Sequence, residues 1–138
     1  MAKATRFVPG VTGLDKLIVA SLVTGIEART TTSDGTGTGT ITDGPSLITV
    51  NVTSSSANNI LVLPTPTPGT IVVAFVGSNG YELRSDTPAS VGIGGGTGAT
   101  VESAIVAASI MVIFCISATN WVGFTVTAAT LAAIEVAT

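Results

Sequence analysis

The feature of this sequence that most restricts its fold is a series of short β-prone runs, separated by turn-forming residues, that starts at residue 46. In residues 46–53, SLITVNVT, the apolar side chains Ile48, Val50 and Val52 alternate with polar ones, as in a half-buried strand. Similar runs follow at residues 60–63, 70–77, 81–86, 110–117, 121–128 and 130–137. This spacing, with Gly, Pro, Asn and Ser between the runs, predicts an all-β domain, an antiparallel β-sandwich or jelly-roll-like knob.

Two of the runs, residues 70–77 and 110–117, are apolar on both faces. A small sandwich does not easily cover both faces of its strands, so the second face needs cover from another chain. We therefore expect a subunit interface, in a homotrimer, with the candidate residues Val73, Phe75, Ile113, Cys115 and Trp121.

Charge is scarce and unevenly distributed. Only 9% of the 138 residues are charged, against roughly 25% in ordinary soluble domains. Four of the five basic residues lie in residues 1–29, and beyond them Arg84 is the only one. Such a surface is poorly protected against association, so we expect copies of the chain or a partner to cover much of it. It also offers no basic patch for nucleic acid.

Composition divides the chain into an arm, a hinge and a body. Residues 1–29 form an N-terminal arm, residues 30–44 (TTTSDGTGTGTITDG) a flexible Thr/Gly hinge, and residues 45–138 a β-rich knob. Apolar residues at helical spacing in the arm predict a short amphipathic helix, which packs either on the chain's own core or on a partner. These residues include Leu14, Leu17, Ile18 and Leu22.

Most catalytic equipment is missing from the sequence. It contains no His, which excludes Ser-His-Asp and Cys-His arrangements and His-based metal sites. The single Cys, Cys115, lies in an apolar run, where we expect a buried and unreactive thiol. Glu82, Arg84 and Asp86 alternate along one run, which is more typical of a solvated edge strand than of a catalytic carboxylate pair. We predict that the protein is not an enzyme and has no metal or cofactor.

Residues 92–105, GIGGGTGATVESAI, contain the spacing G-x-G-x-x-A of dinucleotide-binding loops. Such a loop binds a dinucleotide only between a strand and a helix, with an acidic residue about 20 residues further on. Here a Pro-interrupted segment precedes the glycines, and residues 115–121 contain no acid. The glycines therefore indicate a loop in which backbone segments approach closely.

Membrane association and secretion are not expected. Residues 103–119 form an uncharged apolar stretch that is slightly too short to span a bilayer, and its β-branched residues favour buried strands. Near the N-terminus, Lys3 and Arg6 precede an apolar run as in a signal peptide, but Pro9, Asp15 and Lys16 interrupt the pattern.

Residues 66–124 resemble small decoration (cement) proteins, and related head-fibre proteins, of tailed bacteriophages including cyanophages. The resemblance rests on GYELRS at residues 80–85, GGGTGA and VESAI within residues 94–105, and SATNW at residues 117–121. It implies a β-rich knob, commonly trimeric, that sits on the outside of an assembled icosahedral capsid and clamps neighbouring capsomers. The expected partners are the major capsid protein and further copies of the chain. The expected location is the virion surface, after synthesis in the host cytoplasm.

The resemblance also implies that an N-terminal arm contacts the shell. We therefore expect the first 29 residues to attach the knob to an acidic capsid surface, although they match no motif of the family. The candidate contacts are Lys3, Arg6, Val8, Leu14, Leu17, Ile18 and Leu22. The alternative function is a carbohydrate- or receptor-binding fibre module, with Trp121 and Tyr81 as stacking platforms.

Overall fold

The computed structural model describes residues 26–98, 100–128, 130–134 and 136–138. The expected capsid contacts from Lys3 to Leu22, and the helix expected there, lie outside the described residues. The elements are β1 (Glu27–Thr30), η2 (Gly37–Gly39), β2 (Leu47–Thr53), β3 (Ile60–Val62), β4 (Ile71–Val76), β5 (Tyr81–Arg84), β6 (Gly92–Ile93), β7 (Ser103–Ile105), β8 (Ile110–Ser117), β9 (Asn120–Val126) and β10 (Leu131–Ala133). The all-β class is confirmed for this part of the chain, whose helical element is the short 3-10 turn η2.

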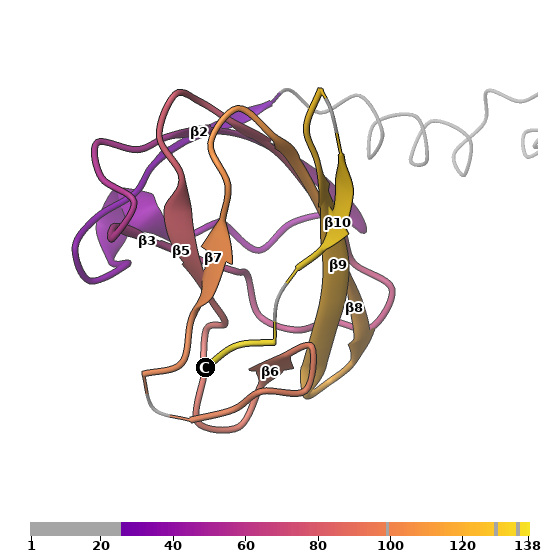
Figure 1. Ribbon diagram of the computed structural model, residues 1–138. Helices are drawn as coiled ribbons and strands as arrows, with labels where there is room; N and C mark the ends of the chain where they lie inside the picture. The colour runs from indigo at the N-terminus through magenta and orange to yellow at the C-terminus, as the bar shows by residue number, and fades with distance from the viewer. Residues whose placement is uncertain (1–25, 99, 129, 135) are drawn as a thin grey trace, which may run out of the picture.

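The strands form two sheets that enclose one core. Sheet A has the order β1-β2-β4-β8-β9-β10, with β6 also pairing with β9, and sheet B has the order β3-β5-β7. Figure 1 shows β3, β5 and β7 on one side of the molecule and β8, β9 and β10 on the other, with the C-terminus below β7. Consecutive strands from β2 to β5 alternate between the sheets, and each sheet contributes one apolar face to the space between them.

The first half of the chain is a parallel coil, which corrects the expected antiparallel order. Glu27 pairs with Val50 and Val50 with Ala74, so β1, β2 and β4 stack in parallel at about 23–24 residues per turn. On sheet B, β3 and β5 stack in parallel in the same way. Only the second half forms the expected antiparallel pairs, β5 with β7, β4 with β8, β8 with β9 and β9 with β10.

The physical reason for the coil is the connection between the runs. A run and its successor become a hairpin only when a tight turn joins them within one sheet. Here the segments after β2 and after β3 cross to the opposite sheet, and the second of them contains Pro64, Pro66 and Pro68, which cannot donate to a ladder. The next strand therefore pairs with the strand one full turn earlier.

Residues 30–44 are part of this coil, so the expected flexible hinge is wrong. Thr32 pairs with Ile60, Thr40 pairs with Val62, and Ile41 is buried in the core. Gly35 packs so closely on sheet B that a Cβ there would lie 2.6 Å from Cγ2 of Val62. The body thus begins at β1 rather than at residue 45. The Thr and Gly residues of this segment pair with sheet B and pack closely on it, so they do not form a flexible linker.

The glycine-rich loop packs against the C-terminal segment. A Cβ at Gly96 would overlap the carbonyl oxygen of Ala137, and the φ of Gly94 is +62°. The Ala137 N–H donates to the carbonyl of Ile93 at 3.2 Å, and Thr138 and Glu102 exchange two backbone hydrogen bonds. This agrees with the interpretation that the glycines allow backbone segments to approach closely.

Candidate interaction surface

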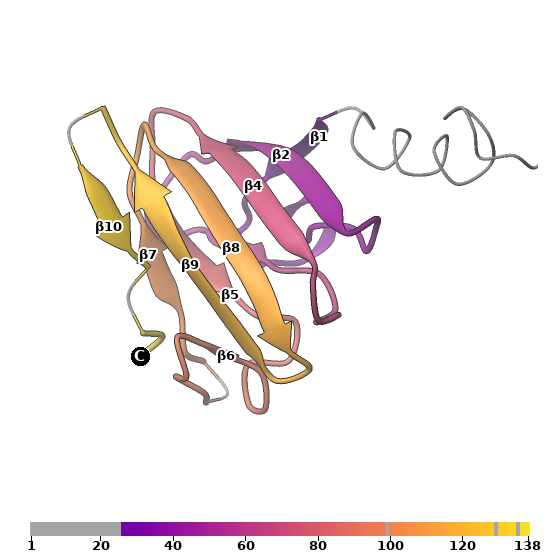
Figure 2. The same ribbon diagram turned by 90° about the vertical axis from the view of Figure 1, so that its right-hand side faces the viewer.

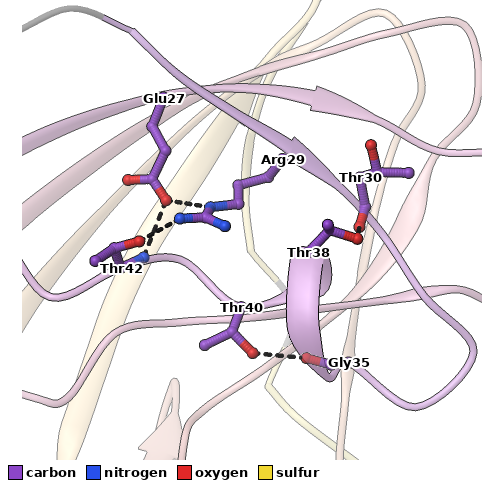
Figure 3. A network of polar contacts seen from close by, with 7 residues as sticks. All are labelled: Glu27, Arg29, Thr30, Gly35, Thr38, Thr40 and Thr42. Carbon is purple, nitrogen blue, oxygen red and sulfur yellow. Dashed lines mark hydrogen bonds and ion pairs between the residues drawn. The ribbon is translucent and has the colours of Figure 1, made fainter.

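A polar network connects β1 to the loop before β2. Arg29 Nε donates to Glu27 Oε1, Arg29 Nη2 donates to Thr42 Oγ1, and the Thr42 N–H donates to Glu27 Oε1 at 3.0 Å (Figure 3). Two separate hydrogen bonds lie nearby, from the Thr38 hydroxyl to the Thr30 carbonyl and from the Thr40 hydroxyl to the Gly35 carbonyl. Glu27 and Arg29 are therefore paired within the chain, and the network holds β1 against the loop that leads into β2.

Two cavities of about 320 and 470 Å³ adjoin this network and share Arg29, Thr42 and Asp43. Asp43 Oδ1 accepts the Thr65 N–H at 2.7 Å, and Arg29 is bound to Glu27. The grooves therefore present groups already engaged in holding loops together. Among the described residues no cluster of metal-ligating side chains occurs.

Three of the five candidate subunit-interface residues lie in the core. Ile113, Cys115 and Trp121 are at most 2% exposed, and they pack between the sheets of one chain. Burial raises the pKa of the Cys115 thiol, as expected for the predicted unreactive cysteine. Their placement in a subunit interface was wrong because the apolar runs bury one face within the chain.

The proposed stacking platforms are also inaccessible. Trp121 and Tyr81 are at most 1% exposed, and the Tyr81 hydroxyl lies 3.7 Å from the sulfur of Met111. Burial raises the pKa of Tyr81. Neither ring can stack on a sugar in this fold, which removes the residues on which the glycan-binding alternative depended.

The sequence indicated that the charged run forms an edge strand, but β5 lies in the middle of sheet B. Sheet B places β5 between β3 and β7, and Arg84 forms an ion pair with Glu102. Asp86 accepts a hydrogen bond from the Thr87 hydroxyl. Glu82 and Arg84 do point away from the core, as their alternation indicated. The run alone could not show which strands lie beside β5.

The outer face of sheet A is an apolar surface that no described segment covers. Register aligns its side chains in rows, for example Val73, Val112 and Phe124, and Phe75, Ile110 and Val126. The rings of Phe114 and Phe124 have centroids 6.3 Å apart. We define the outer face by the outward residues of four strands: Ile71, Val73, Phe75, Ile110, Val112, Phe114, Ile116, Val122, Phe124, Val126, Leu131 and Ala133.

No residue of this outer face is charged, and the outward positions of β1 and β2 are uncharged too. Figure 2 views the sheet from this side, and no described segment crosses in front of β4, β8 or β9. Val73 and Phe75, the other two candidate interface residues, lie here, half-buried and exposed respectively. Sequence analysis found these two because their run is apolar at every position.

The remaining face residues escaped sequence analysis. In β9 the apolar residues Val122, Phe124 and Val126 point outward, whereas Trp121 and Thr125 point into the core. Alternation showed that these two sets lie on opposite sides of the strand, yet ordinary hydrophobicity would place Phe124 inside and Thr125 outside.

Comparisons with known proteins add no relative. No family model matches the sequence, and neither a curated protein nor a solved structure matches it. Within the described residues, no helix has the length and hydropathy to span a bilayer.

Proposed function

We propose that this protein is a structural decoration protein of a tailed-bacteriophage capsid. In this proposal it binds the outside of the assembled head as a homotrimer and stabilises contacts between capsomers, with the major capsid protein as its partner. The observation that carries the proposal is the uncharged apolar outer face of sheet A, because a protein that functions by burying surface needs such a face.

The family resemblance supports the same function from another direction. The resembling segment, residues 66–124, contributes β4, β8 and β9, the strands that supply most of the outer face. The polar groups of Glu27, Arg29 and Thr42 bind one another within the chain. The grouping of resemblance and apolar face in one segment favours a module whose function is association.

Attachment to the shell is proposed for the N-terminal arm. Residues 1–25 carry Lys3, Arg6 and Lys16 against Asp15, and the chain enters the body at β1. Exposed ion pairs contribute only about 0.2–1 kcal/mol each, so apolar contacts must supply most of the affinity of one arm. Three arms on one trimer would bind with avidity.

The test is reconstitution of heads that lack the protein. Purified protein is mixed with such heads, the heads are sedimented, and the bound copies are counted and located by cryo-electron microscopy. We expect many copies on the shell surface, and loss of binding when residues 2–25 are deleted. That deletion spares β1, whereas deletion of residues 2–29 removes its pairing with β2 and serves as a folding control.

Failure to bind heads, or presence only at a tail or fibre tip, contradicts the proposal. Full occupancy by the protein without residues 2–25 contradicts the role of the arm and places the attachment surface on the body.

A further inference from the structure

We propose that the outer face of sheet A is the self-association surface, and that the same face of further copies of this chain covers it. The inference rests on the proposed homotrimer and names the surface that builds it. It replaces Ile113, Cys115 and Trp121, which are buried, with residues that a second chain can reach.

Large apolar side chains of the outer face are exposed side by side. Five of its residues remain well exposed: Phe75 at 39%, Ile110 at 39%, Ile116 at 56%, Val126 at 36% and Leu131 at 71%. With their half-buried neighbours they form one uncharged apolar surface across four paired strands, β4, β8, β9 and β10. Large apolar side chains that are exposed side by side, rather than singly, mark an interaction surface.

The chemistry of the face selects a partner of the same kind. A charged partner surface would lose its hydration here without gaining an opposite charge, because no residue of the face is ionisable. An uncharged apolar sheet imposes no such loss, and around a three-fold axis the same faces of three copies can cover one another. The Phe114 and Phe124 rings lie in this face, and aromatic residues are enriched in interface cores.

On sheet B, the chain itself covers part of the apolar outer face. Its outward Val62 lies under the loop at Gly35, and the rest of that side carries Glu82 and Arg84. No described segment does the same for sheet A. The described part of the chain leaves sheet A uncovered, and a second copy is a partner that the neutrality of the face fits.

The experiment compares Val126→Lys with Val106→Lys. Both replace an exposed valine, one in the outer face of sheet A and one, 57% exposed, next to β7 of sheet B. Molar mass is measured by light scattering at micromolar concentration on the full-length chain. Fluorescence of the single, buried Trp121 reports that each variant is folded. We expect an oligomer for the wild type and Val106→Lys, and at least a tenfold higher dissociation constant for Val126→Lys.

A second pair of variants guards against misfolding. Val112→Cys places a thiol in the centre of the outer face, and Ala104→Cys places one on the exposed side of β7. Native Cys115 is buried and stays unmodified. A bifunctional thiol reagent should link copies of Val112→Cys and leave Ala104→Cys as single chains.

The outcomes separate this inference from the proposed function. An oligomer that Val126→Lys leaves intact, or equal dissociation by both lysine variants, overturns the outer face as the contact surface. A monomeric wild type overturns self-association, and if Val126→Lys then abolishes head binding, the face binds the shell instead. An oligomer that depends on the face but does not bind heads supports this inference and overturns capsid decoration.

Discussion

The outer faces of the two sheets differ in how their apolar side chains are covered. Both carry apolar side chains, because the runs that form β3, β4 and β8 are apolar at nearly every position. On sheet B, the Gly35–Gly39 loop packs on the apolar side chains, and the Arg84–Glu102 ion pair occupies other outward positions. On sheet A no described segment does so. The difference shows that a loop of Thr and Gly can cover one sheet face, and that the described part of the chain leaves the other face uncovered.

The largest expected effect concerns the inner side of sheet A. Ile113 is fully buried, so Ile113→Ala should lower the free energy of unfolding by about 2–5 kcal/mol. Its neighbour Val112 points outward, and Val112→Ala should change the stability of the dissociated chain by less than about 1 kcal/mol while weakening association. Urea denaturation followed by Trp121 fluorescence measures both. Equal losses in the dissociated chain would mean that the two sides of β8 are wrongly assigned.

Removing the cover of sheet B should have the next largest effect. Gly35 has φ +80° and almost touches Val62, so Gly35→Val should destabilise the fold by about 1–3 kcal/mol and expose apolar surface to a hydrophobic dye. Gly37 has φ +59° but open space around it. The control Gly37→Ala therefore carries only the backbone strain, about 1 kcal/mol, without new dye binding. Similar dye binding by both variants would show that the loop does not cover the sheet.

The inner side of sheet B should respond to alkali. Burial raises the pKa of Tyr81 in the folded state, so the folded chain holds its proton more tightly than the unfolded chain. The resulting stabilisation is complete below the ordinary tyrosine pKa of about 10 and is lost as pH rises above it. Absorbance of the phenolate should therefore appear together with cooperative unfolding. Tyr81→Phe should remove this pH dependence, at a cost near neutral pH of about 0.5–1.5 kcal/mol. Reversible ionisation in the folded protein would contradict the burial of this ring.

The smallest expected effect is that of the ion pair on sheet B. A double-mutant cycle with Arg84→Ala and Glu102→Ala should give a coupling of about 0.2–1 kcal/mol, because both side chains are partly exposed. Added salt should reduce it. A coupling that grows with salt would show that the two residues act through packing rather than charge.

Much of the strand content could be predicted from the sequence. The runs at residues 46–53, 70–77 and 110–117 became β2, β4 and β8, and Ile48, Val50 and Val52 face the core as their alternation indicated. The burial of Cys115 was predicted from its apolar neighbours and is confirmed. The candidate surface was predicted only at Val73 and Phe75, because alternation identifies two faces without saying which one the core takes.

The sequence by itself determined the all-β class, the positions of most strands and the scarcity of surface charge, because these depend on residue types and their local spacing. Only the tertiary structure decided the parallel coil, the packing of residues 30–44 and the outward direction of Phe124. Pairing depends on which strand lies one turn away, and that is a non-local property. Thr125 could be buried and Phe124 left outside because Trp121 lies on the core side of β9, and a period of two then directs every second residue of the strand outward.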